Sequence, residues 1–185
     1  MPNQQRNLYF IALVPHSALR ERVENLKKEM KDSFNAKHAL KSPAHITLQM
    51  PFRSSTQTET KLIQTLEEFA RQQDTFEINL SGFDCFEPRV IFIKISDHTP
   101  ILSLHAKLIP DLANKIEIGE KEISQNIHPH MTIATRDLST QNFNKAWSKF
   151  KNREFKASFL CKSLFLLKHN GSFWDIYQEF LFKKQ

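Results

Sequence analysis

Residues 44–52 read AHITLQMPF, a stretch in which apolar and polar side chains alternate. Successive side chains of an extended chain point to opposite faces, so this period of two predicts a strand with one face in the core. Pro51 is expected to close the strand. The predicted core face carries Ile46, Leu48 and Met50, and the other face carries His45, Thr47 and Gln49.

Residues 128–136 read HPHMTIATR and have the same form, which predicts a second strand with one polar face. In both strands a His and the Thr two positions later point the same way. Among the eight histidines of the chain, only these two have a Thr at this spacing. The second core face carries Met131 and Ile133, and the polar face carries His130, Thr132, Ala134 and Arg136.

The rest of the chain alternates predicted strands and helices, in an order that occurs in the first half and recurs with variation in the second. We therefore expect two similar lobes. Because no Gly-, Ser- or Pro-rich linker divides them, residues 1–185 are expected to form a single domain. Strands are predicted at 8–14, 76–80, 90–95, 155–167 and 174–182, and helices at 19–34, 62–70, 101–112 and 143–150.

Several residues mark the ends of these elements. The segment Thr56–Glu59 resembles a helix capping box, and Ser139 is a candidate helix cap. Pro110 lies inside a helical pattern, and it is expected to kink or end that helix. The dipeptide Asn170–Gly171 is the preferred type I′ turn, so it predicts a β-hairpin.

Length and composition indicate an ordinary globular protein. A chain of 185 residues that is 40% hydrophobic can build the core of one ordinary domain without disulfides or structural metal. Cys85 and Cys161 lie far apart and have no partner at zinc-site spacing. The apolar run 8–14 is too short to cross a membrane, so we expect a cytoplasmic protein with no membrane association. Charged residues of the first helix, Lys27 among them, are expected to form solvated surface.

Paired histidines suit phosphodiester chemistry. The unperturbed imidazole pKa lies near 6.5, so one ring can take a proton from water while the other gives a proton to the leaving oxygen. We expect a bell-shaped rate profile centred near neutrality. Hydroxyls of Thr47 and Thr132, with the cationic Arg136, could bind the phosphate oxygens. No cofactor is needed, and the net charge of +6 favours an anionic partner such as phosphate or RNA.

The chain resembles the 2H phosphoesterases, and within them the 2′-5′ RNA ligase-like proteins, whose signature is two His-x-Thr/Ser-x motifs. Here the motifs are His45–Leu48 and His130–Ile133, and residues 6–13, 86–90 and 129–136 are similar to other landmarks of the family. The stretch 49–53 replaces a Phe-Leu-Gly-like turn of many relatives, which predicts a different pocket rim and substrate.

The resemblance implies a bilobal α+β fold with pseudo-twofold symmetry, in which two antiparallel sheets line a central cleft and helices lie outside. It also implies hydrolysis of 2′,3′-cyclic phosphates on nucleotides or RNA ends, or reversible 2′-5′ RNA ligation. Carried over to this chain, the family pattern makes His45 and His130 the acid and base, in either order, and Thr47 and Thr132 the phosphate clamps. No obligate protein partner is implied.

Three alternatives stay open. The same basic cleft could belong to a non-catalytic module that binds RNA or nucleotides, whose affinity would fall steeply with salt. His45, His128 and His130 could instead hold a metal ion, since imidazole is a common zinc ligand. Arg136 could pair with Asp137 at the end of its strand and not contact substrate.

Overall fold

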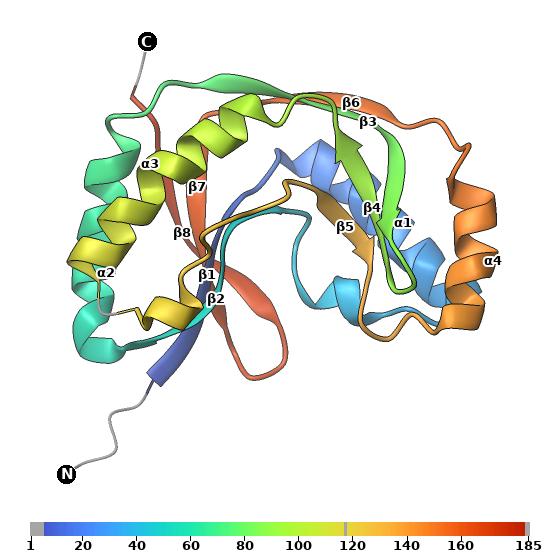
Figure 1. Ribbon diagram of the computed structural model, residues 1–185, viewed down its shortest axis with the longest axis horizontal. Coiled ribbons are helices and arrows are strands. Elements are labelled where there is room, and N and C mark those ends of the chain that lie inside the picture. Colours follow the sequence, from blue (N-terminus) through green and yellow to red (C-terminus); the bar gives the residue numbers. More distant parts are fainter. Residues whose placement is uncertain (1–5, 117, 184–185) are drawn as a thin grey trace.

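The computed structural model describes residues 6–116 and 118–183 (Figure 1). Its strands are β1 (Arg6–Leu13), β2 (Ile46–Ser55), β3 (Phe76–Phe86), β4 (Val90–Ile95), β5 (Met131–Ala134), β6 (Lys156–Cys161), β7 (Ser163–His169) and β8 (Trp174–Leu181). Its α-helices are α1 (Ser17–Phe34), α2 (Thr56–Ala70), α3 (Thr99–Lys115) and α4 (Thr140–Phe150). Two short 3-10 helices are η1 (His38–Lys41) and η2 (Glu120–Glu122).

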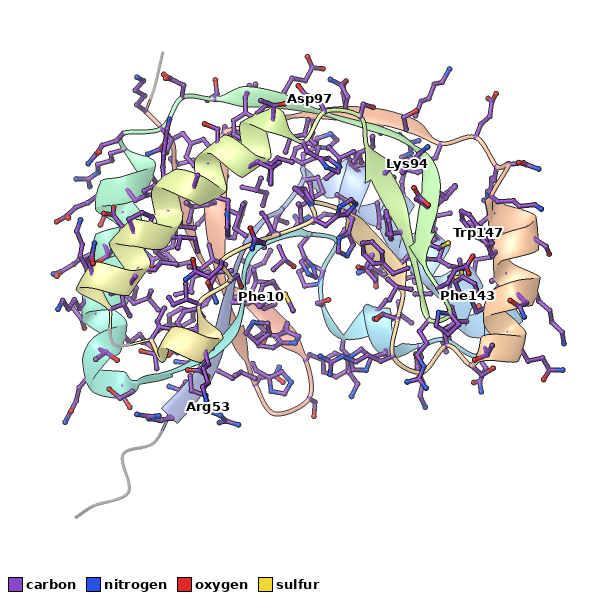
Figure 2. All side chains as sticks on the ribbon, viewed as in Figure 1. Phe10, Arg53, Lys94, Asp97, Phe143 and Trp147 are labelled. Carbon is purple, nitrogen blue, oxygen red and sulfur yellow. The ribbon has the colours of Figure 1, made fainter. Side chains whose placement is uncertain are left out.

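The strands form two four-stranded antiparallel sheets, and the helices cover their outer faces (Figure 1). Sheet I has the order β2-β1-β7-β8 and packs against α2, which in turn contacts α3. Sheet II has the order β5-β4-β3-β6 and packs against α1 and α4. Figure 2 shows Phe143 and Trp147 of α4 on the side of sheet II, where Phe143 belongs to the apolar core and the partly buried Trp147 packs against it. The predicted α+β class with two antiparallel sheets is confirmed.

The two sheets exchange elements, so they do not correspond to the two halves of the sequence. Helix α1 follows β1 of sheet I but packs on sheet II, and β3 joins β4 and β6 in sheet II. The predicted strand 155–167 is in fact two strands that meet at Lys162, of which β6 belongs to sheet II and β7 to sheet I. The chain therefore crosses between the sheets several times, which ties them together.

Strand β2 departs from the predicted alternation after Leu48. The pairing with β1 shifts twice, since Ala12 faces Thr47, Ile11 faces Gln49 and Tyr9 faces Phe52, and each shift inserts one extra residue into β2. One extra residue reverses the faces and a second restores them, so the reversal is confined to the residues between the two shifts. Gln49 is consequently buried and Met50 is exposed, the opposite of the prediction. Pro51 does not end the strand either, because β2 is an edge strand and a bulge tolerates a residue without an N–H.

Two helix signals are also corrected by the structure. Ser55 caps α2 by accepting a hydrogen bond from the Thr58 N–H, so the helix starts one residue earlier than a Thr56 capping box would place it. Helix α3 continues through Pro110 to Lys115. The carbonyl that Pro110 leaves without a donor belongs to the exposed residue Ala106, where water can bind it. Ser139 caps α4 as predicted.

The hairpin of β7 and β8 is confirmed, but its turn is not type I′. His169 pairs with Trp174, which leaves a four-residue loop. A type I′ turn needs positive φ at both central residues, whereas among the described loop residues only Gly171 has it, at +101°. The Asn170 side chain shapes the loop instead, because its Oδ1 accepts hydrogen bonds from the N–H groups of Ser172 and Phe173.

Strand β1 is buried on both faces, as its continuous apolar run predicts. One face joins the main core beneath the helices. The other face looks toward the space between the sheets and forms a small apolar cluster with β7, made of Phe10, Ala12, Val14, Phe165 and Leu167. Within residues 6–116 and 118–183, no helix combines the length and apolar character that a membrane span requires.

Candidate active site

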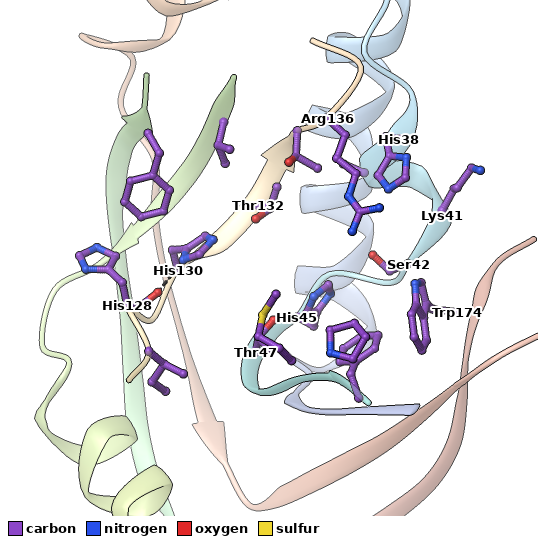
Figure 3. Close-up of a pocket in the computed structure, with 18 of the residues that line it drawn as sticks. His38, Lys41, Ser42, His45, Thr47, His128, His130, Thr132, Arg136 and Trp174 are labelled. Carbon is purple, nitrogen blue, oxygen red and sulfur yellow. Dashed lines mark hydrogen bonds between the residues drawn. The ribbon is translucent and has the colours of Figure 1, made fainter. Parts of the chain in front are cut away.

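A cavity of about 360 Å³ lies between sheet I and sheet II. Its walls come from segments far apart in the sequence, namely η1 with the loop that follows it, β2, β5 with the segments before and after it, and single residues of β1, β3, β4 and β8. Figure 3 shows the polar side chains of both His-x-Thr motifs turned toward it. All five residues singled out in the sequence line this cavity: His45, Thr47, His130, Thr132 and Arg136.

The two motifs reach the cavity from different sheets. Each histidine stands one residue before its strand, His45 before β2 and His130 before β5. Strand β2 is an edge of sheet I and β5 is an edge of sheet II, so the motif strands are not paired neighbours. The cleft therefore brings the two imidazoles together across the gap between two sheets, and it does so without a shared ladder of hydrogen bonds.

Each imidazole is held by a backbone carbonyl two residues earlier in the chain. Nδ1 of His45 lies 2.8 Å from the Pro43 carbonyl oxygen, and Nδ1 of His130 lies 2.6 Å from that of His128. A carbonyl only accepts, so each Nδ1 carries the proton and donates it. In the neutral ring, Nε2 is then the free acceptor on both histidines. The same local geometry thus leaves Nε2 as the unprotonated nitrogen of both neutral rings.

Aromatic rings pack against both histidines. The Phe10 ring centroid lies 4.8 Å from that of His45, and the Phe92 centroid lies 4.8 Å from that of His130. Phe86 meets His130 edge-on, with 5.2 Å between centroids and an interplanar angle of 90°. These contacts fix the ring orientations, and they also exclude water from one side of each imidazole.

Exclusion of water shifts both titrations to lower pH, because burial disfavours the charged form. Burial lowers the pKa of His45 to about 4, and the charges of Lys27 and His130 add to this decrease against the opposing Pro43 carbonyl. Burial also lowers the pKa of His130, to which the charges of His128 and His98 contribute, while the hydrogen bond to the His128 carbonyl opposes the decrease. Both rings are therefore neutral at pH 7 in the free protein.

Lys27 was missed by the sequence analysis, which placed it on solvated surface. Its side chain is only 1% exposed, and Nζ donates a hydrogen bond of 2.7 Å to the Ser42 carbonyl, three residues before His45. Glu24 lies 3.7 Å away as its acidic partner. The helical spacing could have predicted its burial, because Lys27 comes four residues after Val23 and three before Met30, and both of these lie on the buried face of α1. The ammonium group therefore supports the loop that presents His45.

Arg136 does not pair with Asp137. The Asp137 carboxylate accepts hydrogen bonds from two backbone N–H groups of the η1 region, those of Lys37 at 3.0 Å and His38 at 3.1 Å. Arg136 adopts a left-handed backbone conformation with φ of +55° just after β5. In Figure 3 its guanidinium extends toward the cavity beside His38. The alternative in which Arg136 is occupied by its neighbour is therefore wrong.

The proposed three-histidine metal site is not formed by the described part of the chain. Within residues 6–116 and 118–183, no group of three or more His, Cys, Asp or Glu side chains is arranged to hold a metal ion. The ring of His128 instead packs edge-on against His98, with 5.0 Å between centroids.

The chain is similar to known proteins in sequence and in fold. Residues 15–172 match the 2′-5′ RNA ligase superfamily. Two bacterial proteins named "Putative phosphoesterase" are each 25% identical to the chain, one from Oceanobacillus iheyensis over 178 residues and one from Bacillus pumilus over 177 residues. Each comparison covers 94% of this chain and 96% of the relative.

Among solved structures, the apo form of Escherichia coli LigT superposes with a TM-score of 0.67 at 15% identity, covering 97% of this chain and 99% of LigT. A further phosphoesterase structure superposes with a TM-score of 0.70 at 16% identity, covering 97% of this chain and all of the other. These two likenesses show a common fold. Together with the match over most of its sequence, they show that the chain belongs to the 2′-5′ RNA ligase superfamily of 2H phosphoesterases.

Proposed function

We propose that this protein is a phosphoesterase that opens 2′,3′-cyclic phosphates on nucleotides or RNA ends, with His45 and His130 as base and acid. The observation that carries the proposal is the pair of Nε2 acceptors that face one cavity, each oriented by a carbonyl on the opposite ring nitrogen. The names of the bacterial relatives support the reaction class. A LigT structure that contains 3′-AMP supports a nucleotide ligand for this fold.

The proposed reaction moves one proton at each histidine. Nε2 of His45 takes a proton from water as the water oxygen bonds to phosphorus. The bond from phosphorus to one ribose oxygen breaks, and that oxygen takes a proton from Nε2 of His130. The product is a phosphomonoester, and the two histidines regain their starting states by exchange with solvent. Each transfer of this kind accelerates a reaction by about 10² to 10⁴.

The two roles are assigned by environment. His45 has the lower pKa because it is enclosed by protein and lies near the buried Lys27, so it favours the neutral form that a base needs. His130 keeps its proton more readily and serves as the acid. Thr47 and Thr132 are half-buried at the cavity wall, where their hydroxyls can donate to the non-bridging phosphate oxygens. Arg136 supplies positive charge to the same group.

The structure moves the expected pH optimum below neutrality. The profile of kcat/KM reports the free enzyme, which must hold His45 neutral and His130 charged. Because the pKa of His45 lies near 4 and that of His130 lies below its ordinary 6.5, we expect kcat/KM to peak between these values and to fall above pH 6.5. Initial rates from pH 3.5 to 8 at constant ionic strength measure this profile.

Lys27 gives this pH prediction a specific test. Lys27→Met removes a positive charge near His45, so the pKa of His45 should rise and the acid limb of the profile should move to higher pH. Glu24→Gln is the matched control, since it removes the acidic partner of Lys27 and leaves the ammonium in place. An acid limb that stays in place in Lys27→Met, or a peak of the wild-type profile above pH 7, contradicts the assignment of His45 as base.

A substrate panel tests the function itself. We expect multiple turnovers of nucleoside 2′,3′-cyclic phosphates, and the same panel should include 2′-5′-linked dinucleotides and RNA ends to detect cleavage or ligation. Rates with and without a chelator report any need for a metal ion, and we expect them to agree. Stoichiometric binding without turnover of any substrate would refute the enzymatic proposal in favour of a nucleotide-binding module.

A further inference from the structure

A buried glutamine joins the two segments that carry the motif histidines. Gln49 follows the first motif on β2, and its side chain is fully buried. Its Nε2 donates a hydrogen bond of 2.7 Å to the carbonyl of Glu122, 73 residues later in the chain, and its Oε1 accepts one of 3.0 Å from the N–H of Ser124. A carbonyl only accepts and an N–H only donates, so these partners fix the orientation of the amide. We call these contacts the Gln49 bridge.

Ser124 is held by each of its polar groups. Besides the N–H that Gln49 binds, its hydroxyl accepts a hydrogen bond of 2.9 Å from the Met50 N–H. Its carbonyl lies 2.8 Å from Nε2 of His105, a buried residue of α3. Strand β2 belongs to sheet I, and α3 contacts α2, which packs on that sheet. The segment before β5 is therefore fastened to the side of sheet I before it crosses to sheet II (Figure 1).

The Gln49 bridge lies close to both motifs. Gln49 comes four residues after His45, and Ser124 comes six residues before His130. Residues 126–128, which follow Ser124, line the cavity. The far end of β5 is fixed separately, by the hydrogen bonds from the η1 region to Asp137. The bridge therefore fixes the end of β5 at which His130 stands.

The two extra residues of β2 place the amide where it can make these contacts. Gln49 lies between the two shifts of pairing, so it is turned away from the polar face that carries His45 and Thr47. It does not line the cavity. An amide is costly to bury without hydrogen bonds, and an apolar side chain would fill a core position without this cost. The amide at this position therefore serves the contact with the segment before β5.

We infer that Gln49 is a positioning residue whose amide sets the separation of His45 and His130 across the cleft. The inference rests on the proposed function, in which base and acid must act at fixed distances on opposite sides of one phosphorus atom. A misplacement of about 1 Å can lower a rate on the order of 10²-fold. Binding of the phosphate is shared among several groups, so it depends less on this separation.

A pair of buried glutamines tests the inference. Gln49→Met keeps the length of the side chain and removes both hydrogen bonds of the amide. We expect kcat for a 2′,3′-cyclic phosphate to fall about 10- to 100-fold, with a smaller change in KM. Gln73→Met is the matched control, because Gln73 is also buried and its Nε2 donates a hydrogen bond of 3.0 Å to the Phe69 carbonyl, away from the cavity. It should lower the midpoint of urea unfolding but leave kcat within about twofold.

The ring signals of ¹⁵N-labelled histidine in the free protein give a second measurement, which needs no turnover. In Gln49→Met the signals of His130 should move, because the segment that leads to it is released. The signals of His45 should stay, because its contacts with Pro43 and Phe10 remain. Gln73→Met should move neither set of signals.

A smaller change at the other side of the Gln49 bridge guards against a Gln49→Met protein that does not fold. Ser124→Ala removes only the hydrogen bond from the Met50 N–H, and Ser124→Thr keeps a hydroxyl at the same place. We expect Ser124→Ala to lower kcat severalfold and to move the His130 signals, and Ser124→Thr to restore both. An unchanged kcat and unchanged His130 signals in Ser124→Ala would then overturn the inference.

Failure of the inference and failure of the proposed function give different results. In an active wild type, a kcat of Gln49→Met within threefold of wild type, or an equal loss in Gln73→Met, overturns the positioning role alone. A wild type that turns over no cyclic phosphate overturns the proposed function. The ring signals then decide on Gln49, and His130 signals that stay in place in Gln49→Met refute its role.

Discussion

Replacement of either His45 or His130 by Ala is expected to lower kcat/KM for a 2′,3′-cyclic phosphate by about 10² to 10⁴. Each variant removes one proton transfer while the phosphate-binding groups stay in place. The double variant should be little worse than the poorer single variant, because residues that act as a unit do not contribute additively. Initial rates at pH 5.5, near the expected optimum, measure these losses.

His128→Ala is the matched control for this experiment. The His128 ring lies at the same cavity, with its centroid 6.2 Å from that of His130, but the hydrogen bond that orients His130 comes from the His128 backbone carbonyl, and that carbonyl remains in the variant. We expect a change of less than about threefold in kcat/KM, consistent with the small effect of a lost nearby charge. Circular dichroism should show that all variants remain folded. A loss in His128→Ala as large as that in His130→Ala would contradict the assigned roles.

Glu59→Ala is expected to produce the largest loss of stability among single polar substitutions outside the cavity. The Glu59 carboxylate, only 14% exposed, lies against sheet I and accepts hydrogen bonds from Lys168 at 2.7 Å, from Tyr177 at 2.5 Å and from the buried Tyr9 hydroxyl. Its removal leaves an ammonium and a buried hydroxyl without their acceptor. We expect the free energy of unfolding to fall by about 2–3 kcal/mol.

The contribution of Glu59 should also depend on pH. Burial raises the pKa of its carboxyl, but the hydrogen bonds from Lys168, Tyr177 and Tyr9 outweigh burial, so the net pKa lies below the ordinary 4.5. A lowered carboxyl pKa stabilises the fold at pH values above 4.5, and this stabilisation is lost as the pH falls through the lowered pKa. The difference between wild type and Glu59→Ala should therefore be full at pH 7 and shrink in acid.

Glu67→Ala is the control for Glu59. Glu67 lies on the same helix and pairs with Arg71, and both side chains are largely exposed, so the change in unfolding free energy should stay within about 0.5 kcal/mol. Urea unfolding at pH 7 and pH 4 measures both variants. Because none of the Glu59 partners lines the cavity, kcat should not change. A Glu59→Ala protein as stable as Glu67→Ala would show that the cluster contributes nothing.

Most local elements follow from apolar periodicity, since each helix and strand buries one regular face. The apolar periodicity predicts all four α-helices and both strands that follow the motif histidines. The two histidines could be assigned to a common cleft because the motifs recur in the same order of predicted elements. The motif at His45 keeps its predicted faces because both extra residues of β2 come after Thr47. Met50 and Gln49, which lie at the shift, were therefore assigned to the wrong faces.

Three features could not be predicted because they depend on contacts between distant residues. The exchange of strands and helices between the sheets is decided by long-range pairing, which periodicity does not encode. The burial of Lys27 depends on the loop that folds over it. The low pKa of His45 arises from aromatic neighbours such as Phe10, which is 35 residues away in the sequence and on another strand. The tertiary environment therefore sets the titration of residues that the motif alone identifies.

The neutral resting state of both histidines has a consequence for ligand binding. An anionic phosphate placed between the two Nε2 atoms favours the charged imidazole, so binding should draw a proton onto the site. In the proposed reaction, a bound phosphate would therefore raise the pKa of His130 and favour the protonated ring that serves as the acid. Affinity for phosphate ligands should accordingly rise as the pH falls toward 5.

The central claim is that the imidazoles of His45 and His130 act on the same phosphate. Titration of protein carrying ¹⁵N-labelled histidine with 3′-AMP, followed by the ring signals in NMR spectra, tests it most directly. We predict that the Nε2 signals of both residues shift together, with one dissociation constant and one ligand per chain. A shift of only one of the two rings, or two shifts with different dissociation constants, would contradict the account.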